Sequence, residues 1–329
     1  MKLQMRENSV TFNGEVREPM GNTTLAGDLD LNGQSLLRII SGLKLAVVPA
    51  ELVNQKVMLS GRVKANQNEV EFKDSTFQLG QNKLMGDLSL AMGLPSNIRA
   101  NLRADSMDLN WHPACSASKA GDKSKSAEKS KSATPWNGNL IDTSAAASVN
   151  ADVKLALKRF VCGTHTFDEL DVDLSLQDQQ LELKQFKADM SGKGALNLTA
   201  NLNLKGGISG NVKFGADKIA PEVLNPVLGE YLQAPLTASA DLKMSGNSSQ
   251  ALVSSLNGKV AMRADKGTLC GISLKSFVET LRNLAQGQFS ASAPQELNDF
   301  KVNADIEQGV ARLTDFLIDT TDMTVNGEG

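Results

Sequence analysis

Residues 194–205 read GALNLTANLNLK, and this stretch decides the fold class. Five apolar residues alternate there with asparagine or threonine, and four of the five are leucines. Side chains along a β-strand point alternately to its two faces, so a segment with this period has one apolar and one polar face. The sequence therefore predicts a strand whose leucines form an apolar surface.

The same alternation returns along the chain, which predicts many strands of this kind. A short unit also recurs in which a glycine lies between apolar residues and shares their face. Glycine within a strand often marks a bulge or bend, so we expect the sheet to curl around its apolar side. The fold class predicted is mainly β, a long curved antiparallel sheet that forms an open hydrophobic groove. The alternating segments are 170–176, 236–244 and 300–306, and the glycine units are 25–31, 59–65, 84–90, 208–214 and 256–262.

Three amphipathic helices are predicted to cover the sheet, at residues 35–43, 220–232 and 273–286. Their apolar stripes favour packing on the sheet, with capping of a groove as the alternative. Residues 114–139 are rich in Ser, Lys and Ala without apolar period, which predicts a flexible linker. This linker separates a β-rich segment with one helix, 1–113, from a second β-rich segment, 140–329, that we expect to be truncated at its end.

The composition disfavours nucleic-acid binding and a membrane span within this chain. The formal net charge is -3 and aromatic residues are 4% of the chain, without a basic stripe. The most apolar window, 36–48, contains Arg38 and Lys44 and is too short to cross a bilayer. The first 30 residues have no basic segment followed by an apolar one, so no signal peptide is expected.

The sequence offers no case for an enzyme or a cofactor. It contains two histidines and lacks the H-E-x-x-H, G-x-S-x-G and phosphate-loop patterns. The glycine-rich stretch 206–210 joins two alternating segments and is interpreted as a turn. Four neighbouring carboxylates are interpreted as the polar face of a strand rather than as a cation site. These are Asp168, Glu169, Asp171 and Asp173.

The cysteines leave three alternatives open. Cys115 and Cys162, each three residues from a histidine (His112 or His165), could form a tetrahedral zinc set. A disulfide between the two cysteines is the second alternative, and unrelated surface or core positions are the third and favoured one. We therefore predict no metal site. Cys270 is expected to be a small core residue.

The order of these features resembles the AsmA family of Gram-negative envelope proteins. The similarity begins with LAGDLDLNGQSLLRIISGL and continues through VMLSGRVKANQNEVEFKDSTFQLGQNKLMGDLSL and IRANLRADSMDLN. After the low-complexity insertion comes PWNGNLIDTSAAASVNADVKLALKRF. The end of the chain, from LNGKVAMRADKGTLCGISLKSFVETL onward, is similar to the carboxy-terminal signature of the family. The membrane-anchoring helix and first strands of the family are not found here.

The resemblance implies a periplasmic protein that is anchored in the inner membrane when complete. It implies a groove like that of chorein-type bridge lipid-transfer proteins, which carries phospholipids toward the outer membrane. It also implies effects on the assembly and localisation of outer-membrane proteins, with their assembly machinery as a partner.

The strand pattern agrees with that role, because a leucine-rich face with few aromatics can solvate acyl chains without specific contacts. The alternative is a non-catalytic structural or interaction protein whose apolar face is closed by helices. The residues predicted to line the groove are Leu170, Val172, Leu174, Leu176, Leu196, Leu198, Leu202, Leu204, Val212, Phe214, Leu242, Met244, Val260, Met262, Val302 and Ile306.

Overall fold

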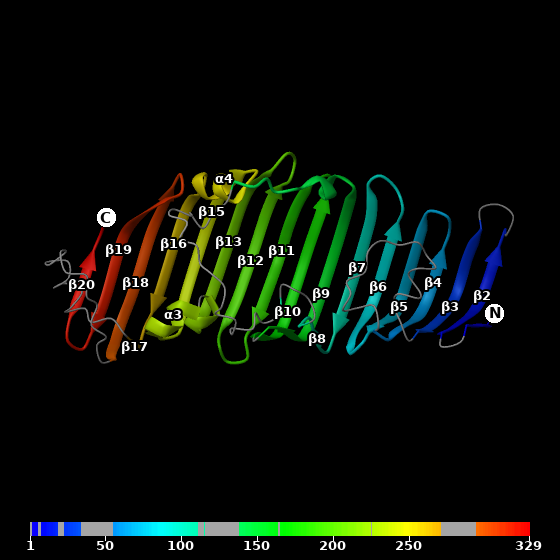
Figure 1. The fold of residues 1–329 in the computed structure, drawn as a ribbon, viewed down its shortest axis with the longest axis horizontal. Helices are drawn as coiled ribbons and strands as arrows, with labels where there is room; N and C mark the ends of the chain where they lie inside the picture. The colour runs from blue at the N-terminus through cyan, green and yellow to red at the C-terminus, as the bar shows by residue number, and fades with distance from the viewer. Residues whose placement is uncertain are drawn as a thin grey trace, which may run out of the picture. The chain divides into compact units, whose positions relative to one another are not determined.

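The fold is mainly β with few helices, as the sequence predicts (Figure 1). A computed structural model provides the coordinates. The predicted helices 35–43 and 273–286 and most of the predicted linker lie outside the described residues. The structure describes residues 2–5, 8–18, 23–33, 55–110, 115, 138–163, 165–224, 226–270 and 294–329.

The chain folds as two compact units. Unit 1 comprises Met1–Lys131 and Thr143–Phe186, and unit 2 comprises Ser132–Asp142 and Lys187–Gly329. Strand β11 (Gln180–Asp189) has residues in both units. The sequence analysis divides the chain into two β-rich segments at the linker on the basis of composition. That division stays a prediction.

Unit 1 is a sheet whose strands pair in the order β1-β2-β3-β4-β5-β6-β7-β9-β10. Most neighbours are antiparallel and follow one another along the chain. The strands are β1 (Lys2–Met5), β2 (Asn8–Arg17), β3 (Thr24–Gly33), β4 (Val57–Ala65), β5 (Glu69–Leu79), β6 (Asn82–Ala91), β7 (Ser96–Ala104), β8 (Met107–Asp108), β9 (Val149–Cys162) and β10 (His165–Gln177).

Two pairings in unit 1, both made by β9, depart from the predicted antiparallel arrangement. Strand β9 pairs parallel with β7, and the short β8 also pairs parallel with β9. A parallel pair needs a crossover connection, and the chain between Ala104 and Val149 provides it. The predicted linker therefore falls within a crossover between neighbouring strands, and a 3-10 helix, η2 (Ser144–Ala147), precedes β9.

Unit 2 is an antiparallel sheet in the order β12-β13-β15-β16-β18-β19-β20. The short β14 and β17 pair with each other, and β17 also pairs with β18. The elements are β12 (Ala195–Asn203), β13 (Ile208–Ile219), α2 (Pro221–Leu224), α3 (Pro226–Tyr231), β14 (Leu232–Gln233), β15 (Leu236–Gly246), α4 (Ser249–Ser254), β16 (Asn257–Ala264), β17 (Gly267–Leu269), β18 (Gln295–Glu307), β19 (Val310–Thr320) and β20 (Thr324–Gly327).

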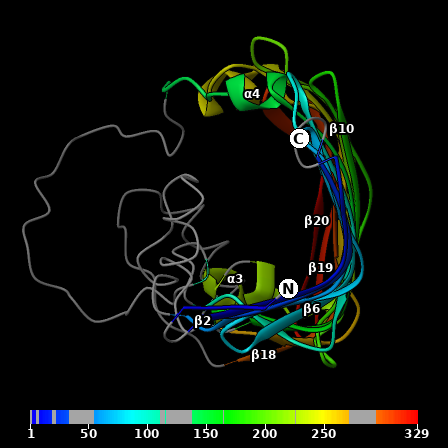
Figure 2. The ribbon, with the colours of Figure 1, turned by 90° about the vertical axis from the view of Figure 1, so that its right-hand side faces the viewer.

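The strands of unit 2 are curved, and α3 and α4 lie on their concave side (Figure 2). The predicted helix 220–232 is in fact two short helices, α2 and α3, which meet near Pro226. Proline lacks an N–H and clashes with the preceding turn, so a continuous helix does not form. The sequence did not predict α4, whose N-cap Ser248 accepts a hydrogen bond from Ala251 N.

The glycines of the recurring unit lie on the apolar side, where backbones approach closely. Gly210 has φ +151° and Gly258 has φ +148°, a region that favours glycine. A Cβ atom at Gly210 would lie 2.0 Å from the carbonyl oxygen of Asn201, and one at Gly258 would lie 2.0 Å from that of Asp241. These positions therefore need glycine. Register shifts, typical of bulges, accompany two other copies, at Gly61 and opposite Gly86.

Candidate functional site

The strands of unit 2 present one continuous apolar face, because the register places apolar residues side by side across five strands. One row consists of Leu198, Phe214, Ala240, Val260 and Ala304. The neighbouring rows contain the other predicted groove residues of β12 to β18, so the structure brings them together on this face. These rows are Leu196-Ala216-Ala238-Met262-Val302, Ala200-Val212-Leu242-Gly258-Ile306 and Leu202-Gly210-Met244. Leu204, the remaining residue predicted from this strand, follows the end of β12 and is half-buried.

The opposite face of unit 2 is polar, and several of its charges pair between strands. Lys213 Nζ lies 3.3 Å from Asp241 Oδ2, and Lys259 Nζ lies 4.0 Å from Asp305 Oδ1. Both lysines are more than half exposed, so these pairs contribute little to stability. Charged side chains are nevertheless costly to bury, so they keep this face of the sheet in contact with water. The other face is therefore the one available for apolar contacts.

The apolar face is only partly covered. Among the sixteen predicted groove residues, Leu170 of unit 1 alone is buried, and the twelve that belong to unit 2 are all half-buried. In a closed core these leucines and valines would be buried, since large aliphatic side chains are among the residues most often hidden from water. The face is therefore accessible along the middle of the strands.

One margin of the apolar face of unit 2 is closed. Ile219, Leu236 and Leu297 have 0% exposure and Ala264 has 1%. Ile219 pairs with Leu236, and Leu236 pairs with Ala264, so these side chains form one contiguous margin. We call this margin the closed rim of unit 2. The helices α2 and α3 follow directly from β13 at this end, and Figure 2 places α3 on the concave side there.

The opposite margin is formed by the turns around α4, and we call it the open rim of unit 2. Strand β15 runs from Leu236 in the closed rim to Gly246, where a Cβ atom would meet Ala251 and Leu252 of α4 within 2.7 Å. Helix α4 therefore packs against the end of the apolar face. Met244 and Leu252 nevertheless stay half-buried.

Unit 1 has an apolar face of its own, built on the pairing of β9 with β10. Leu170, Val172 and Leu174 lie opposite Leu157, Leu155 and Val153. The parallel pairing extends this face to β7, whose apolar residues the sequence analysis did not assign to the groove. Alternation in ADVKLAL and IRANLRA could have identified them. The residues missed include Ile98, Ala100, Leu102, Val153, Leu155 and Leu157.

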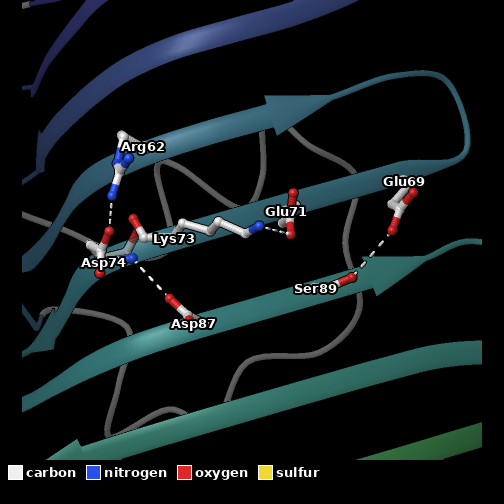
Figure 3. A network of polar contacts seen from close by, with 8 residues as sticks. Arg62, Glu69, Glu71, Lys73, Asp74, Asp87 and Ser89 are labelled. Atoms are coloured by element: carbon white, nitrogen blue, oxygen red, sulfur yellow. Dashed lines mark hydrogen bonds and ion pairs between the residues drawn. The ribbon is translucent and has the colours of Figure 1, made fainter.

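The polar face of unit 1 carries a network of paired charges across β4, β5 and β6 (Figure 3). Arg62 forms an ion pair with Asp74, whose backbone N–H donates to Asp87 Oδ1 at 2.9 Å. Lys73 Nζ lies 3.0 Å from Glu71 Oε1. Both basic residues of this network therefore have an acidic partner.

A hollow of about 630 Å³ is lined mostly by residues of this polar face, among them Asp87, Arg103 and Lys154. Lys154 pairs with Asp173 at 3.5 Å, and Asp87 accepts the hydrogen bond from Asp74. The hollow is lined by several charged side chains, so it does not suit an apolar ligand. The carboxylates Asp171 and Asp173 lie on the polar side of β10, as the alternation predicts.

Cys115 and Cys162 form a disulfide, so the favoured interpretation of unrelated positions is wrong. The bond also excludes the two cysteines as zinc ligands, because zinc binds cysteine as a thiolate and not as a disulfide. His112 lies outside the described residues. Cys115 is buried although it belongs to the predicted flexible linker, because the bond holds it against the end of β9. Cys270 is half-buried, which corrects its assignment to the core.

Other site types find no support in the described part of the chain. No group of three or more His, Cys, Asp or Glu side chains among the described residues could hold a metal ion. The helices described include none that is long and apolar enough to span a membrane. The half-buried apolar faces are thus the strongest candidate site.

The comparison with protein families decides the assignment of the chain. The model of the AsmA family matches residues 2–316, nearly the whole sequence. The chain belongs to the AsmA family. AsmA family protein YhjG of Escherichia coli (strain K12) is 24% identical, over 97% of this chain and 49% of the relative. This AsmA chain therefore spans about half the length of that relative, and no solved structure matches it.

Membership of the AsmA family indicates an envelope-related function. The family resemblance inferred from the sequence is thereby confirmed. The assignment of the sixteen groove residues to lipid binding stays a prediction.

Proposed function

We propose that the apolar faces of this AsmA chain hold the acyl chains of phospholipids during transport between the inner and outer membranes. The observation that carries the proposal is the incomplete burial of a continuous apolar surface. Leu198, Phe214 and Val260 lie side by side on three neighbouring strands and are half-buried. A soluble domain rarely leaves a large apolar patch uncovered without a partner for it.

Acyl chains suit this surface chemically. They need apolar contact over their length but no directed hydrogen bonds, and each methylene removed from water contributes about 0.8 kcal/mol. The rows on unit 2 are apolar and contain no charged side chain between Leu196 and Val302 or between Leu198 and Ala304. A few methylenes against such rows would hold a lipid reversibly, without a catalytic group.

The disulfide supports a location in an oxidising compartment. Disulfides form and persist in secreted and periplasmic proteins and are rare in the cytosol. The Cys115–Cys162 bond and the envelope association of the family therefore favour the periplasm.

Co-purified lipid tests the proposal. The chain, secreted to the periplasm and purified without detergent, is extracted with organic solvent, and its lipids are identified by mass spectrometry. Phospholipid at a stoichiometric or higher ratio to protein supports the proposal. A lipid-free chain that instead captures outer-membrane assembly proteins would favour the alternative of a structural or interaction protein.

A further inference from the structure

The two rims of unit 2 differ in charge as well as in burial. The closed rim is surrounded by charged residues, some of them paired, such as Lys193 with Glu222 at 3.8 Å. The charged residues around this rim are Lys193, Asp217, Lys218, Glu222, Asp265, Lys266 and Glu296. A lipid tail would have to pass these charges to enter from this side, and it would then meet side chains that are already packed.

The open rim of unit 2 is formed mostly by hydroxyl and amide side chains. In its described turns Lys205 is the only basic residue, and the nearby acids are Asp142 and Glu307. Several of the polar groups bond to one another, such as Ser255 Oγ, which accepts from Ser245 N at 2.8 Å. The other polar residues of this rim are Asn247, Ser249, Gln250, Ser254, Asn257 and Gln308.

Unit 1, described by itself, has the same asymmetry. Ala104, Leu157 and Leu170 are buried at one end of its strands, where Lys158 Nζ lies 2.8 Å from Asp105 Oδ1. At the other end the described turns 66–68, 92–95 and 144–148 carry no charged residue, although Asp178 lies in a further turn and Arg17 and Glu18 lie where β2 ends. Leu94 is 94% exposed there.

We propose that phospholipids lie along the strands with their headgroups at the open rim, and that the groove does not select them by headgroup charge. This inference rests on the proposed function. Selective recognition of an anionic phosphate headgroup uses clustered arginines or lysines. The described turns of the open rim of unit 2 offer a single lysine near two carboxylates instead, so zwitterionic and anionic headgroups meet nearly the same field from these residues.

The dimensions of unit 2 agree with this orientation. From Ala240 to Gly246, β15 covers about 20 Å at 3.3 Å per residue. One leaflet of a bilayer has a hydrocarbon thickness of about 15 Å, half of the bilayer core. An acyl chain can therefore lie along the half-buried part of the strand, with its headgroup in water beyond Gly246.

In the test, the purified chain is mixed with vesicles that contain equimolar phosphatidylethanolamine and phosphatidylglycerol with identical acyl chains. The chain is then re-isolated, and bound lipid is quantified by mass spectrometry. The inference predicts both lipids bound in nearly the supplied ratio. Enrichment of either by about tenfold would overturn it. If neither lipid is bound, the proposed function itself fails, which is a distinct result.

Two pairs of substitutions locate the headgroup. Asn247→Lys with Gln250→Lys places two exposed cations at the open rim, and Gln233→Lys with Thr321→Lys places two at the closed rim. The open-rim pair should enrich bound phosphatidylglycerol severalfold, and the closed-rim pair should leave the ratio unchanged. An unchanged ratio in the open-rim pair, or a shift in the closed-rim pair, would overturn the orientation. Circular dichroism establishes that both variants keep the β-fold.

Discussion

Leu198 of β12 and Phe214 of β13 lie directly opposite each other on the apolar face of unit 2, and both are half-buried. The residues that flank Phe214 in sequence, Lys213 and Gly215, belong to the polar face. A cross-strand pair of this kind normally belongs to a packed core. Here it forms part of an accessible surface, and the chain's stability should therefore depend little on its middle rows and strongly on the closed rim.

Truncation of leucines in β15 should show this difference. Leu236 has 0% exposure and Leu242 is half-buried in the same strand. We expect Leu236→Ala to lower the free energy of unfolding by about 2–5 kcal/mol because it leaves a cavity. Leu242→Ala should cost well under half as much, since its side chain already contacts water. Urea unfolding followed by circular dichroism measures both, and equal losses would mean that the middle rows are a closed core.

Glycine positions on the apolar side should tolerate no side chain. Gly210→Ala and Gly258→Ala each place Cβ against a carbonyl oxygen at 2.0 Å and require an unfavourable φ. Each should destabilise the fold by more than about 1 kcal/mol. Gly327→Ala is the matched control, since a Cβ atom there meets nothing within 4 Å. Thermal unfolding should separate the first two variants from the third, and three similar melting curves would contradict this explanation.

The disulfide should contribute substantially to the stability of unit 1. The linked cysteines are 47 residues apart, and closing a loop of that length restricts the unfolded chain by about 4 kcal/mol in the chain-entropy model. We expect Cys115→Ser with Cys162→Ser to lose a large part of this stability. Cys270→Ser controls for loss of a thiol outside the bond. If unfolding of the double variant matched that of the control, the bond would have no structural role.

Asp105 offers a local test of the charged end of unit 1. The hydrogen bond and charge of Lys158 hold the pKa of this carboxyl below its ordinary value of 3.8. Any stability from this pair is present at pH values above 3.8 and is lost as pH falls through the lowered pKa. Lys158→Gln should raise the pKa of Asp105 toward 3.8, as measured by NMR titration. An unchanged pKa would mean that the contact is absent in solution.

Much of the fold could be predicted because strand alternation is local. The period in residues 194–205 identified both β12 and its apolar face, since each side chain's face depends only on its position in the strand. The pairing of β7 with β9 could not be predicted in this way. It joins residues separated by the crossover, and no local pattern encodes a parallel partner.

The candidate site was predicted in part for the same reason. Alternation predicts which residues share a face, but not how much of that face is covered. Leu236 and Leu242 have the same parity in β15, yet one belongs to the closed rim and the other to the accessible surface. Leu236 lies at the end of the sheet where α2 and α3 follow β13, a placement that depends on the tertiary fold. The disulfide likewise depends on the crossover returning Cys115 to Cys162.

The amount of bound lipid in two matched pairs of variants tests the central claim most directly. Leu198→Glu with Leu202→Glu places carboxylates on the apolar face, and Asn197→Glu with Asn201→Glu places the same charge on the polar face of the same strand. A carboxylate beside acyl chains is costly to desolvate, but on an accessible face it can reach water, so the fold should survive. We predict that the leucine variant is folded and lipid-free while the asparagine variant keeps its lipid, as counted by mass spectrometry. A leucine variant that unfolds, or one that stays folded with undiminished lipid, would contradict the account.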